Sequence, residues 1–357
     1  MTHIGIDARE LSGHPTGVGR YLQRLLGEWS RLSTACRWTL YSPDARLAVP
    51  PGLDAQVALV PGAGGTLWEQ RALAVAVRAD RPDVFFSPGY TAPLGIDVPL
   101  VVAIHDVSFA AHPEWFSWRE GARRRFLARR AARKARAVLT ISQFSRGEIE
   151  RHLGVAPAKI RVVPLGVGLP ARAADGPRDP LVLYVGSIFN RRHLPALIDG
   201  FARVSSSHAD LRLEIVGANR THPPQDLRRL ADATSGGDRI RLRDWVDDAE
   251  LADLYSRASA FVFLSEYEGF GLTPLEALAS GVPPVVLDTA VGREVLGEAA
   301  IFVPAPTADA VAGALRAALT GPDRQRVAAA SGAVLARYDW RRSAELTLAH
   351  LLEAAGR

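Results

Sequence analysis

Residues 260–281 read AFVFLSEYEGFGLTPLEALASG and combine three patterns in one stretch. The continuous apolar run at 260–264 is typical of a parallel strand that is covered on both faces. The glycines at 269 and 271 allow a close approach of the backbone, and an apolar helical pattern follows them. A strand, a glycine-rich turn and a helix in this order are the repeating unit of a doubly wound α/β sheet.

The start of this helix carries a capping signal. Thr273 is predicted as the N-cap, Pro274 as the first helical residue and Glu276 as the third, which is the pattern of a capping box. In that interpretation Glu276 only bonds to the backbone N–H of Thr273. The same geometry places a helix N-terminus beside the glycine turn, where a diphosphate could bind and a carboxylate could reach ribose hydroxyls. Both interpretations stay open for Glu276, whereas Glu268 has no comparable structural role.

The rest of the chain repeats the strand–helix alternation in two series. The expected strands of the first series are residues 3–7, 38–41, 56–60, 84–87, 100–105 and 137–141, and those of the second are 181–185, 211–216, 240–242, 260–264 and 285–287. Between the series, residues 164–180 are rich in Pro, Gly and Ala and are the predicted linker. The pattern predicts two doubly wound, Rossmann-like α/β domains that face each other across a cleft.

Two strands of the first series are followed by residues that could contact a ligand. Gly17 and Gly19 lie in TGVGRY, between the first strand and an amphipathic helix, where backbone N–H groups could approach a phosphate. The alternative is a flexible β-to-α turn. His105 and Asp106 end the fifth strand and are expected at the cleft, since ligands of parallel sheets bind beyond the strand C-termini. The alternative is an Asp that caps the next segment.

A basic loop opens the second series. The sequence VGSIFNRRH follows the strand at 181–185 and brings Gly186, Ser187, Arg191 and Arg192 together. Adjacent guanidinium groups are fork-shaped donors for phosphate oxygens. Their alternative is a solvated helix start, but cations are disfavoured at the positive end of a helix dipole. This local misfit favours the functional interpretation.

Composition excludes several classes of protein. The 357 residues carry a net charge of +5 and a pI near 9.7, but the basic residues other than Lys134 and Lys159 are all Arg. This ratio indicates a codon bias more than a nucleic-acid partner, and no nucleic acid is expected. Cys36 is alone, so neither a disulfide framework nor a thiolate metal site is predicted. No signal peptide or membrane-spanning run is recognisable, and a cytoplasmic protein is expected.

The strongest charge pattern is the run ARRRFLARRAARKARAV. Residues 119–136 contain nine basic residues and one acid, a net charge of +8. On a helical wheel most of the basic residues occupy one half and Arg124 is the exception, while the apolar arc comprises Leu127, Ala128, Ala131, Ala132, Ala135 and Val138. We expect a structural helix outside the active site. Its charged face is either solvated, or docks to anionic lipid or a lipid-diphosphate acceptor, or binds nucleic acid.

The motifs together resemble the retaining glycosyltransferases of the large GT-B family 4. The segment EGFGLTPLE at 268–276 keeps two glutamates eight positions apart, as in that family. Further similar segments, in the same order along the chain, are GIDARELSGHPTGVGRYLQRLL, AIHDVSFAAHPEWF, ISQFSRGEI with VVPLGV, LYVGSIFNRRHLPALIDGF and DDAELADLYSRASAFVFLS. The resemblance implies an N-terminal acceptor-side domain at 1–170, a nucleotide-sugar domain at 171–335 and a C-terminal helix at 336–357 that crosses back to the first domain.

The resemblance also implies roles for residues. His105, Glu268, Arg191 and Arg192 form the implied catalytic set; Glu268 would lie beside the transferring sugar, His105 would contact it and the arginines would bind the diphosphate. The implied donor-binding set comprises Gly17, Gly19, Asp106, Gly186, Ser187, Gly269, Phe270, Gly271, Leu272, Thr273 and Glu276, with Glu276 on the ribose.

The implied reaction moves a mannose-like or glucose-like hexose from a GDP- or UDP-sugar to a hydroxyl, with retention of the anomeric configuration. The expected acceptor is a glycan or lipid-linked acceptor of bacterial surface polysaccharide synthesis. No metal and no cofactor are expected, because the chain has no Asp-x-Asp pair. Contact with the inner face of the plasma membrane through residues 119–136 is a further expectation. The alternatives are a nucleotide-sugar epimerase of GT-B type and a non-catalytic basic protein that binds membrane or nucleic acid.

Overall fold

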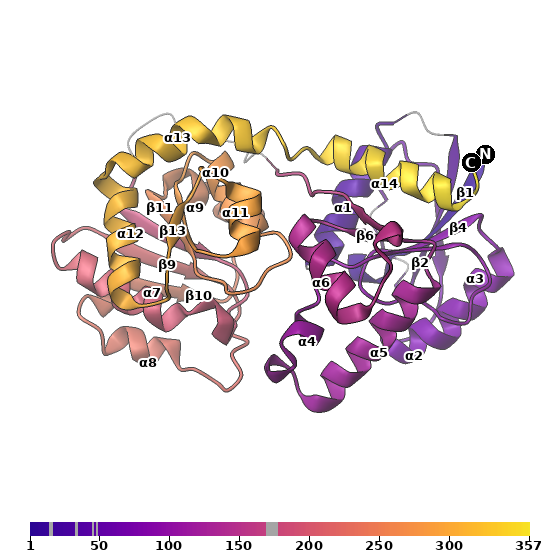
Figure 1. The fold of residues 1–357 in the computed structure, drawn as a ribbon, viewed down its shortest axis with the longest axis horizontal. Helices are drawn as coiled ribbons and strands as arrows, with labels where there is room; N and C mark the ends of the chain where they lie inside the picture. The colour runs from indigo at the N-terminus through magenta and orange to yellow at the C-terminus, as the bar shows by residue number, and fades with distance from the viewer. Residues whose placement is uncertain (14–16, 33–34, 45, 48, 169–177) are drawn as a thin grey trace. The chain divides into compact units, whose positions relative to one another are not determined.

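The computed structural model describes residues 1–13, 17–32, 35–44, 46–47, 49–168 and 178–357. The chain divides into two compact units (Figure 1): unit 1 is Met1–Gly166 together with Asp339–Arg357, and unit 2 is Val167–Tyr338. Thr16 and most of the predicted linker, residues 169–177, lie outside the described residues. Each unit is an α/β domain with its own parallel sheet, as the sequence predicts.

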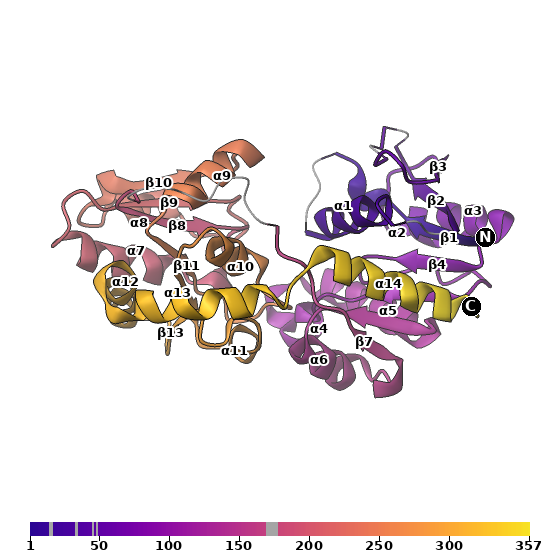
Figure 2. The ribbon, with the colours of Figure 1, turned by 90° about the horizontal axis from the view of Figure 1, so that it is seen from above.

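Among the described residues, the sheet of unit 1 has seven parallel strands in the order β3-β2-β1-β4-β5-β6-β7. Figure 2 shows β3, β2, β1 and β4 of this sheet side by side. Their bounds are β1 (Thr2–Asp7), β2 (Cys36–Ser42), β3 (Ala55–Leu59), β4 (Val84–Ser87), β5 (Leu100–Ala103), β6 (Ala137–Thr140) and β7 (Ile160–Val162). The strand order reverses between β1 and β4. At such a switch point the loops leaving adjacent strands diverge, which opens a space at the carboxyl edge of the sheet.

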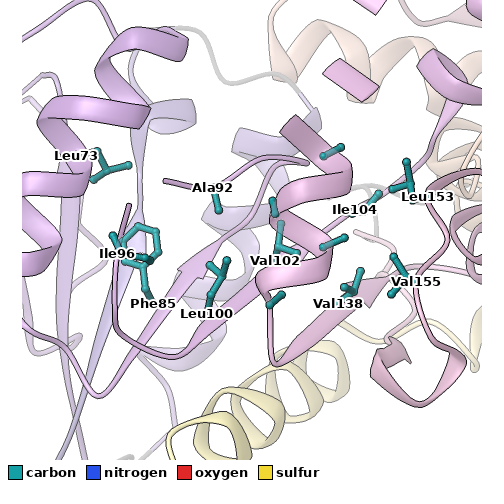
Figure 3. Close-up of a cluster of buried hydrophobic side chains, with 14 of the residues drawn as sticks. Leu73, Phe85, Ala92, Ile96, Leu100, Val102, Ile104, Val138, Leu153 and Val155 are labelled. Atoms are coloured by element: carbon teal, nitrogen blue, oxygen red, sulfur yellow. The ribbon is translucent and has the colours of Figure 1, made fainter. Parts of the chain in front are cut away.

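Helices cover both faces of this sheet. They are α1 (Gly17–Trp29), α2 (Thr66–Trp68), α3 (Ala74–Asp80), α4 (Ser108–Ala111), α5 (Trp118–Lys134), α6 (Gln143–Leu153) and α14 (Trp340–Ala354), with a π-helical turn at Glu69–Leu73 between α2 and α3. Figure 3 shows Phe85, Leu100, Val102 and Val138 of neighbouring strands in one apolar cluster. The intervening strand residues are also buried, so both faces of the sheet are covered.

The predicted basic helix is α5, and its inward face is mostly alanine. Ala128, Ala131 and Ala132 are fully buried in the cluster on the sheet. The helical wheel placed Val138 in the apolar arc of this helix, which is wrong. The helix ends at Lys134, and Val138 lies in β6. The small side chains let the helix approach the sheet closely, and the strand follows after only two residues.

The C-terminal helix α14 packs inside unit 1. The indole Nε1 of Trp29 in α1 donates a hydrogen bond to the carbonyl oxygen of Ala344 at 2.9 Å. The Trp29 ring is stacked on the ring of Trp38, with centroids 4.6 Å apart. The guanidinium of Arg136 donates to the carbonyl oxygen of Ala354, near the end of the helix, at 2.8 Å. These contacts make the last 19 residues part of unit 1.

Unit 2 repeats the architecture with six parallel strands in the order β10-β9-β8-β11-β12-β13. Its strands are β8 (Leu181–Val185), β9 (Arg212–Val216), β10 (Ile240–Arg243), β11 (Ala260–Phe263), β12 (Pro284–Leu287) and β13 (Ile301–Val303). Its helices are α7 (Leu194–Ser205), α8 (Leu227–Asp232), α9 (Asp248–Arg257), α10 (Leu272–Ala279), α11 (Ala290–Leu296), α12 (Ala308–Thr320) and α13 (Pro322–Leu335). Here the strand order reverses between β8 and β11.

The contact of α14 with α1 yields a test of the fold. Replacement of Trp29 by Ala removes a fully buried ring and its hydrogen bond, and we expect a loss of about 3–5 kcal/mol in the free energy of unfolding of unit 1. Chemical denaturation followed by circular dichroism measures the change. Trp118, which is 79% exposed, is the matched control, and Trp118→Ala should change stability by less than about 0.5 kcal/mol. Equal effects of the two substitutions would contradict this packing.

Candidate functional site

Two loops meet at the switch point of the unit 2 sheet. One loop leaves β8 and carries Gly186, Ser187, Arg191 and Arg192, and the other leaves β11 and runs to α10. The backbone N–H of Glu266 donates to the carbonyl oxygen of Arg191 at 3.0 Å, which ties the loops together. The structure thus brings together the unit 2 residues that were predicted from separate motifs.

An ion pair between Arg192 and Glu268 lies at the centre of this site. The Nε and Nη2 atoms of Arg192 both donate to Oε1 of Glu268, at 3.1 and 2.8 Å. The two side chains are only 11% and 23% exposed. Burial by itself would lower the pKa of Arg192, but its interactions with Glu268 and Tyr184 together more than offset this effect and the pKa is raised, so the guanidinium stays charged.

Backbone groups and a serine complete the surroundings of the ion pair. The Nη1 atom of Arg192 donates to the carbonyl oxygen of Ser187 at 2.6 Å. The hydroxyl of Ser265 donates to Oε1 of Glu268 at 2.8 Å. Gly186 has a φ of +141°, and a Cβ added there would lie 2.7 Å from Nη1 of Arg192. Gly186 is therefore needed both for its backbone conformation and for the space that Arg192 occupies.

Arg191 is placed differently from Arg192. Its guanidinium lies over the ring of Phe189, 4.3 Å from the centroid, and its side chain is partly exposed. The turn Asn190–Arg192 is a single 3₁₀ turn, and α7 begins only at Leu194 after His193 in the left-handed conformation. The two arginines therefore precede the helix rather than start it.

The helix α10 begins earlier than predicted. Its N-cap is Gly271, with a φ of +94°, and its first helical residue is Leu272. The prediction of Thr273 as N-cap and Glu276 as the third helical residue was wrong, because the turn needs a left-handed residue that glycine provides at 271. Glu276 lies on the second turn, is partly buried and accepts a hydrogen bond from the hydroxyl of Tyr255 at 3.2 Å.

The glycine turn before α10 is held by its own aromatic residue. Gly269 is buried, and the ring of Phe270 packs edge-on against Tyr338 at a centroid distance of 5.1 Å. The ring of Phe270 thus belongs to the core of unit 2. A small pocket of about 30 Å³ lies beside this turn, with Ser265, Glu268 and Gly271 in its lining.

The four predicted residues of unit 1 lie at the carboxyl edge of its own sheet. His105 is 9% exposed; its Nε2 is 2.8 Å from the carbonyl oxygen of Pro88, and burial lowers its pKa. Asp106 accepts hydrogen bonds from the hydroxyl of Tyr90 at 2.8 Å and the N–H of Ser108 at 2.9 Å. Asp106 therefore has the capping contact that its alternative interpretation foresaw.

Gly17 and Gly19 lie in the first turn of α1, and Gly17 borders a large pocket within unit 1. This pocket has a volume of about 510 Å³ and lies near the switch point between β1 and β4. Its lining residues are Arg9, Glu10, Gly17, Val18, Gly65, Thr66, Glu69, Gly89, Tyr90, Thr91, Phe109, Arg123, Arg124 and Leu127.

A buried charge cluster under this pocket was not predicted. The Nη2 atom of Arg9 donates to Oδ2 of Asp7 at 2.7 Å and also to Glu69, which in turn accepts from the hydroxyl of Thr91 at 2.6 Å. Burial raises the pKa of Asp7, an effect that Arg9 opposes and Glu69 adds to. The missed signal is the sequence DAR directly after the first strand, which follows the same rule as His105 and Asp106.

The described residues contain neither a metal-binding cluster nor a membrane-spanning helix. Among them, no group of three or more His, Cys, Asp or Glu side chains is arranged to hold a metal ion. Nor does any helix within the described ranges have the length and apolar character to cross a membrane.

Known proteins resemble this chain in both of its units. Residues 171–333 match the family model "Glycosyl transferases group 1", and residues 15–169 match the model "Glycosyltransferase Family 4". The O-antigen chain mannosyltransferase B of Escherichia coli is 26% identical over 295 residues, which cover 77% of this chain and 75% of that protein. The O-antigen chain mannosyltransferase RfbU of Salmonella typhimurium is 28% identical over 57% of this chain and 56% of its own length.

Solved structures share the fold over nearly the whole chain. WaaG, a glycosyltransferase involved in lipopolysaccharide biosynthesis, superposes with a TM-score of 0.76 and 16% identity, covering 98% of this chain and 99% of WaaG. Anabaena HepE in complex with UDP-glucose gives a TM-score of 0.76 and 16% identity, covering 99% of this chain and 100% of HepE.

The space beside Gly186 yields a prediction. We expect Gly186→Ala to destabilise unit 2 by about 1–3 kcal/mol and to displace Arg192, because alanine strains the positive φ and its Cβ collides with the guanidinium. Thermal unfolding measures the change. Gly147→Ala in α6 is the control; no atom lies within 4 Å of its added Cβ, so it should be neutral or stabilising by up to about 1 kcal/mol. A Gly186→Ala protein as stable as the wild type would refute this arrangement.

Proposed function

Since the chain belongs to the group 1 glycosyltransferases of GT-B fold, we propose that it transfers a hexose from a nucleotide sugar to a hydroxyl with retention of configuration. The donor is a GDP- or UDP-sugar with a mannose-like or glucose-like residue. The acceptor is a glycan or glycolipid of bacterial surface polysaccharide synthesis. Two O-antigen mannosyltransferases among the relatives and a HepE structure with UDP-glucose support this choice.

The ion pair of Arg192 and Glu268 is the observation that carries the proposal. Removing an arginine–carboxylate pair from water costs free energy that the attraction within the pair does not always recover. A pair that is kept at the switch point of the sheet in spite of this cost points to a role in ligand binding. The loops on either side supply Arg191 and the N-terminus of α10, both suited to a diphosphate. Glu276 on the second turn of α10 is placed to accept hydrogen bonds from the ribose hydroxyls.

The proposed chemistry depends on electrostatics rather than on a protein nucleophile. As the bond from the anomeric carbon to the diphosphate breaks, negative charge grows on the leaving phosphate. Arg191, Arg192 and the backbone N–H groups from Gly269 to Thr273 stabilise that charge. Glu268 fixes the direction of Arg192 and lies beside the sugar. Attack and departure on one face of the sugar then retain the anomeric configuration, with the leaving phosphate as base.

A nucleotide-sugar epimerase of GT-B type is the second candidate. An epimerase isomerises the sugar without an acceptor, whereas a transferase leaves the sugar unchanged and releases a nucleoside diphosphate only when an acceptor hydroxyl is present. Product analysis by NMR separates the two activities and also reports the anomeric configuration of the new bond. The relatives found are transferases, which favours the first candidate.

We further propose that the outward face of α5 brings the enzyme to an anionic membrane surface. This face is formed by Arg129, Arg130 and Arg133, which are exposed, and by Phe126, whose side chain is 58% exposed. Trp118 at the start of the helix is 79% exposed. Basic residues with exposed aromatic rings are typical of a peripheral membrane contact.

The ribose contact gives a first test. A dozen nucleotide sugars are screened for protection against thermal unfolding, since a ligand that binds the folded state raises stability. For the best donor we expect Glu276→Ala to weaken binding about 10- to 100-fold, because a hydrogen-bonding charge is lost. Glu298→Ala, at a side chain that is 79% exposed in the same unit, should bind as the wild type does. Unchanged affinity and turnover in Glu276→Ala would sink the assignment.

The membrane contact has a separate test. Reversal of Arg129, Arg130 and Arg133 to Glu should weaken binding to vesicles of phosphatidylglycerol and phosphatidylcholine at least about 100-fold, and added salt should weaken the wild-type binding. The control reverses Arg31, Arg46 and Arg341, which are 74%, 89% and 69% exposed. It changes the net charge of the protein by the same amount as the first triple variant. If both triple variants bind vesicles alike, the contact through α5 is wrong.

A further inference from the structure

The 510 Å³ pocket of unit 1 is large enough for a ligand and is not used by the donor site of unit 2. A monosaccharide with a substituent is of the size that such pockets hold. Its wall combines the first turn of α1, the Gly89–Thr91 segment after β4, the start of α2 and one side of α5. Tyr90 in this wall has a φ of +59°, a conformation that a non-glycine residue keeps only where its surroundings enforce it.

The exposed position of Arg124 in the pocket is the first observation that indicates the kind of ligand. By its helical position it lies on the same side of α5 as Ala128 and Ala131, which are buried against the sheet. Arg124 is nevertheless 46% exposed, because it lines the pocket. Its Nη2 donates to Glu120 at 2.5 Å. A guanidinium has five N–H donors, and an exposed pair of this kind is weak, so Arg124 can also bind an anion.

Two further features add positive charge to the wall of the pocket. Arg123 from the same helix lines it and bonds to the neutral hydroxyl of Thr66. The helix α1, 13 residues long, begins in the wall with Gly17 and Val18, so the positive end of its dipole lies there. The net charge of +8 over residues 119–136 adds to the field around the pocket.

The acidic side chains around the pocket lie beside arginine donors. Below the pocket, Asp7 and Glu69 both accept hydrogen bonds from Arg9. At the rim, Glu120 accepts a hydrogen bond from Arg124, and Glu10 is exposed to water, which screens its charge. The basic residues that remain leave the 119–136 segment with its net charge of +8.

We propose that this pocket binds the acceptor through an anionic group on its sugar, a carboxylate or a phosphate, which Arg124 recognises together with Arg123 and the start of α1. Tyr90, Thr91 and Glu69 provide the aromatic and polar wall for the sugar ring. The proposal rests on the proposed transferase function and narrows its acceptor to acidic saccharides. It also assigns a specificity role to an arginine of the helix that the sequence placed outside the active site.

Ligand-observed NMR on the full chain tests this inference with three probes: methyl glucuronide, glucose 6-phosphate and the neutral methyl glucoside. At least one anionic probe should bind ten times more tightly than the glucoside, and which one binds identifies the group as carboxylate or phosphate. Arg124→Gln should weaken that binding about tenfold or more. Arg146→Gln is the matched control, because Arg146 forms a similar exposed pair with Glu150 in α6, outside the pocket.

The outcomes separate this inference from the proposed function. Equal binding of the neutral and anionic probes, or an Arg124→Gln protein that binds no worse than Arg146→Gln, would overturn the anionic acceptor site. Protection by nucleotide sugars should be the same in both variants and the wild type, since the donor site lies in unit 2. If no nucleotide sugar protects even the wild type, the transferase function itself fails.

Discussion

The buried pair of Arg192 and Glu268 is the interaction on which the unit 2 site depends. Removing this pair from water costs free energy. Hydrogen bonds with the carbonyl of Ser187 and the hydroxyl of Ser265 offset part of that cost, and Gly186 leaves the space that Arg192 occupies. The pair itself joins the loops after β8 and β11, which are neighbours because the strand order reverses there. The sheet topology thus fixes where this pair of charges lies.

Unit 1 uses the same arrangement with other residues. Arg9 follows the first strand of its sheet and binds Asp7 and Glu69, at the side where the order of its strands reverses. In both units a desolvated guanidinium is held by carboxylates at the carboxyl edge of a parallel sheet. In unit 2 this group lies between glycine-rich loops, whereas in unit 1 it forms the floor of a pocket with arginines from α5. The second arrangement suits a saccharide with an anionic substituent.

The sequence was most informative where a pattern is local. Among the described residues the apolar runs predicted eleven of thirteen strands, and the group 1 family and GT-B fold class that the sequence indicated are confirmed. The strands β7 and β13 were missed because they are short edge strands, defined by their pairing with one neighbour rather than by a local pattern. The prediction of Thr273 as N-cap failed because a capping pattern in the sequence does not reveal the positive φ that makes Gly271 the N-cap. The cluster of Arg9 with Glu69 joins residues 60 positions apart, and such contacts come only from tertiary structure.

We propose that Arg192 and Glu268 act as one unit in holding the donor diphosphate. Calorimetric titration of a nucleoside diphosphate into the wild type, Arg192→Gln, Glu268→Gln and the double variant measures this coupling directly. The double variant should lose little more affinity than either single variant, and the coupling free energy should exceed about 1 kcal/mol. Losses that add to within about 0.5 kcal/mol would contradict it, because the two side chains would then act independently.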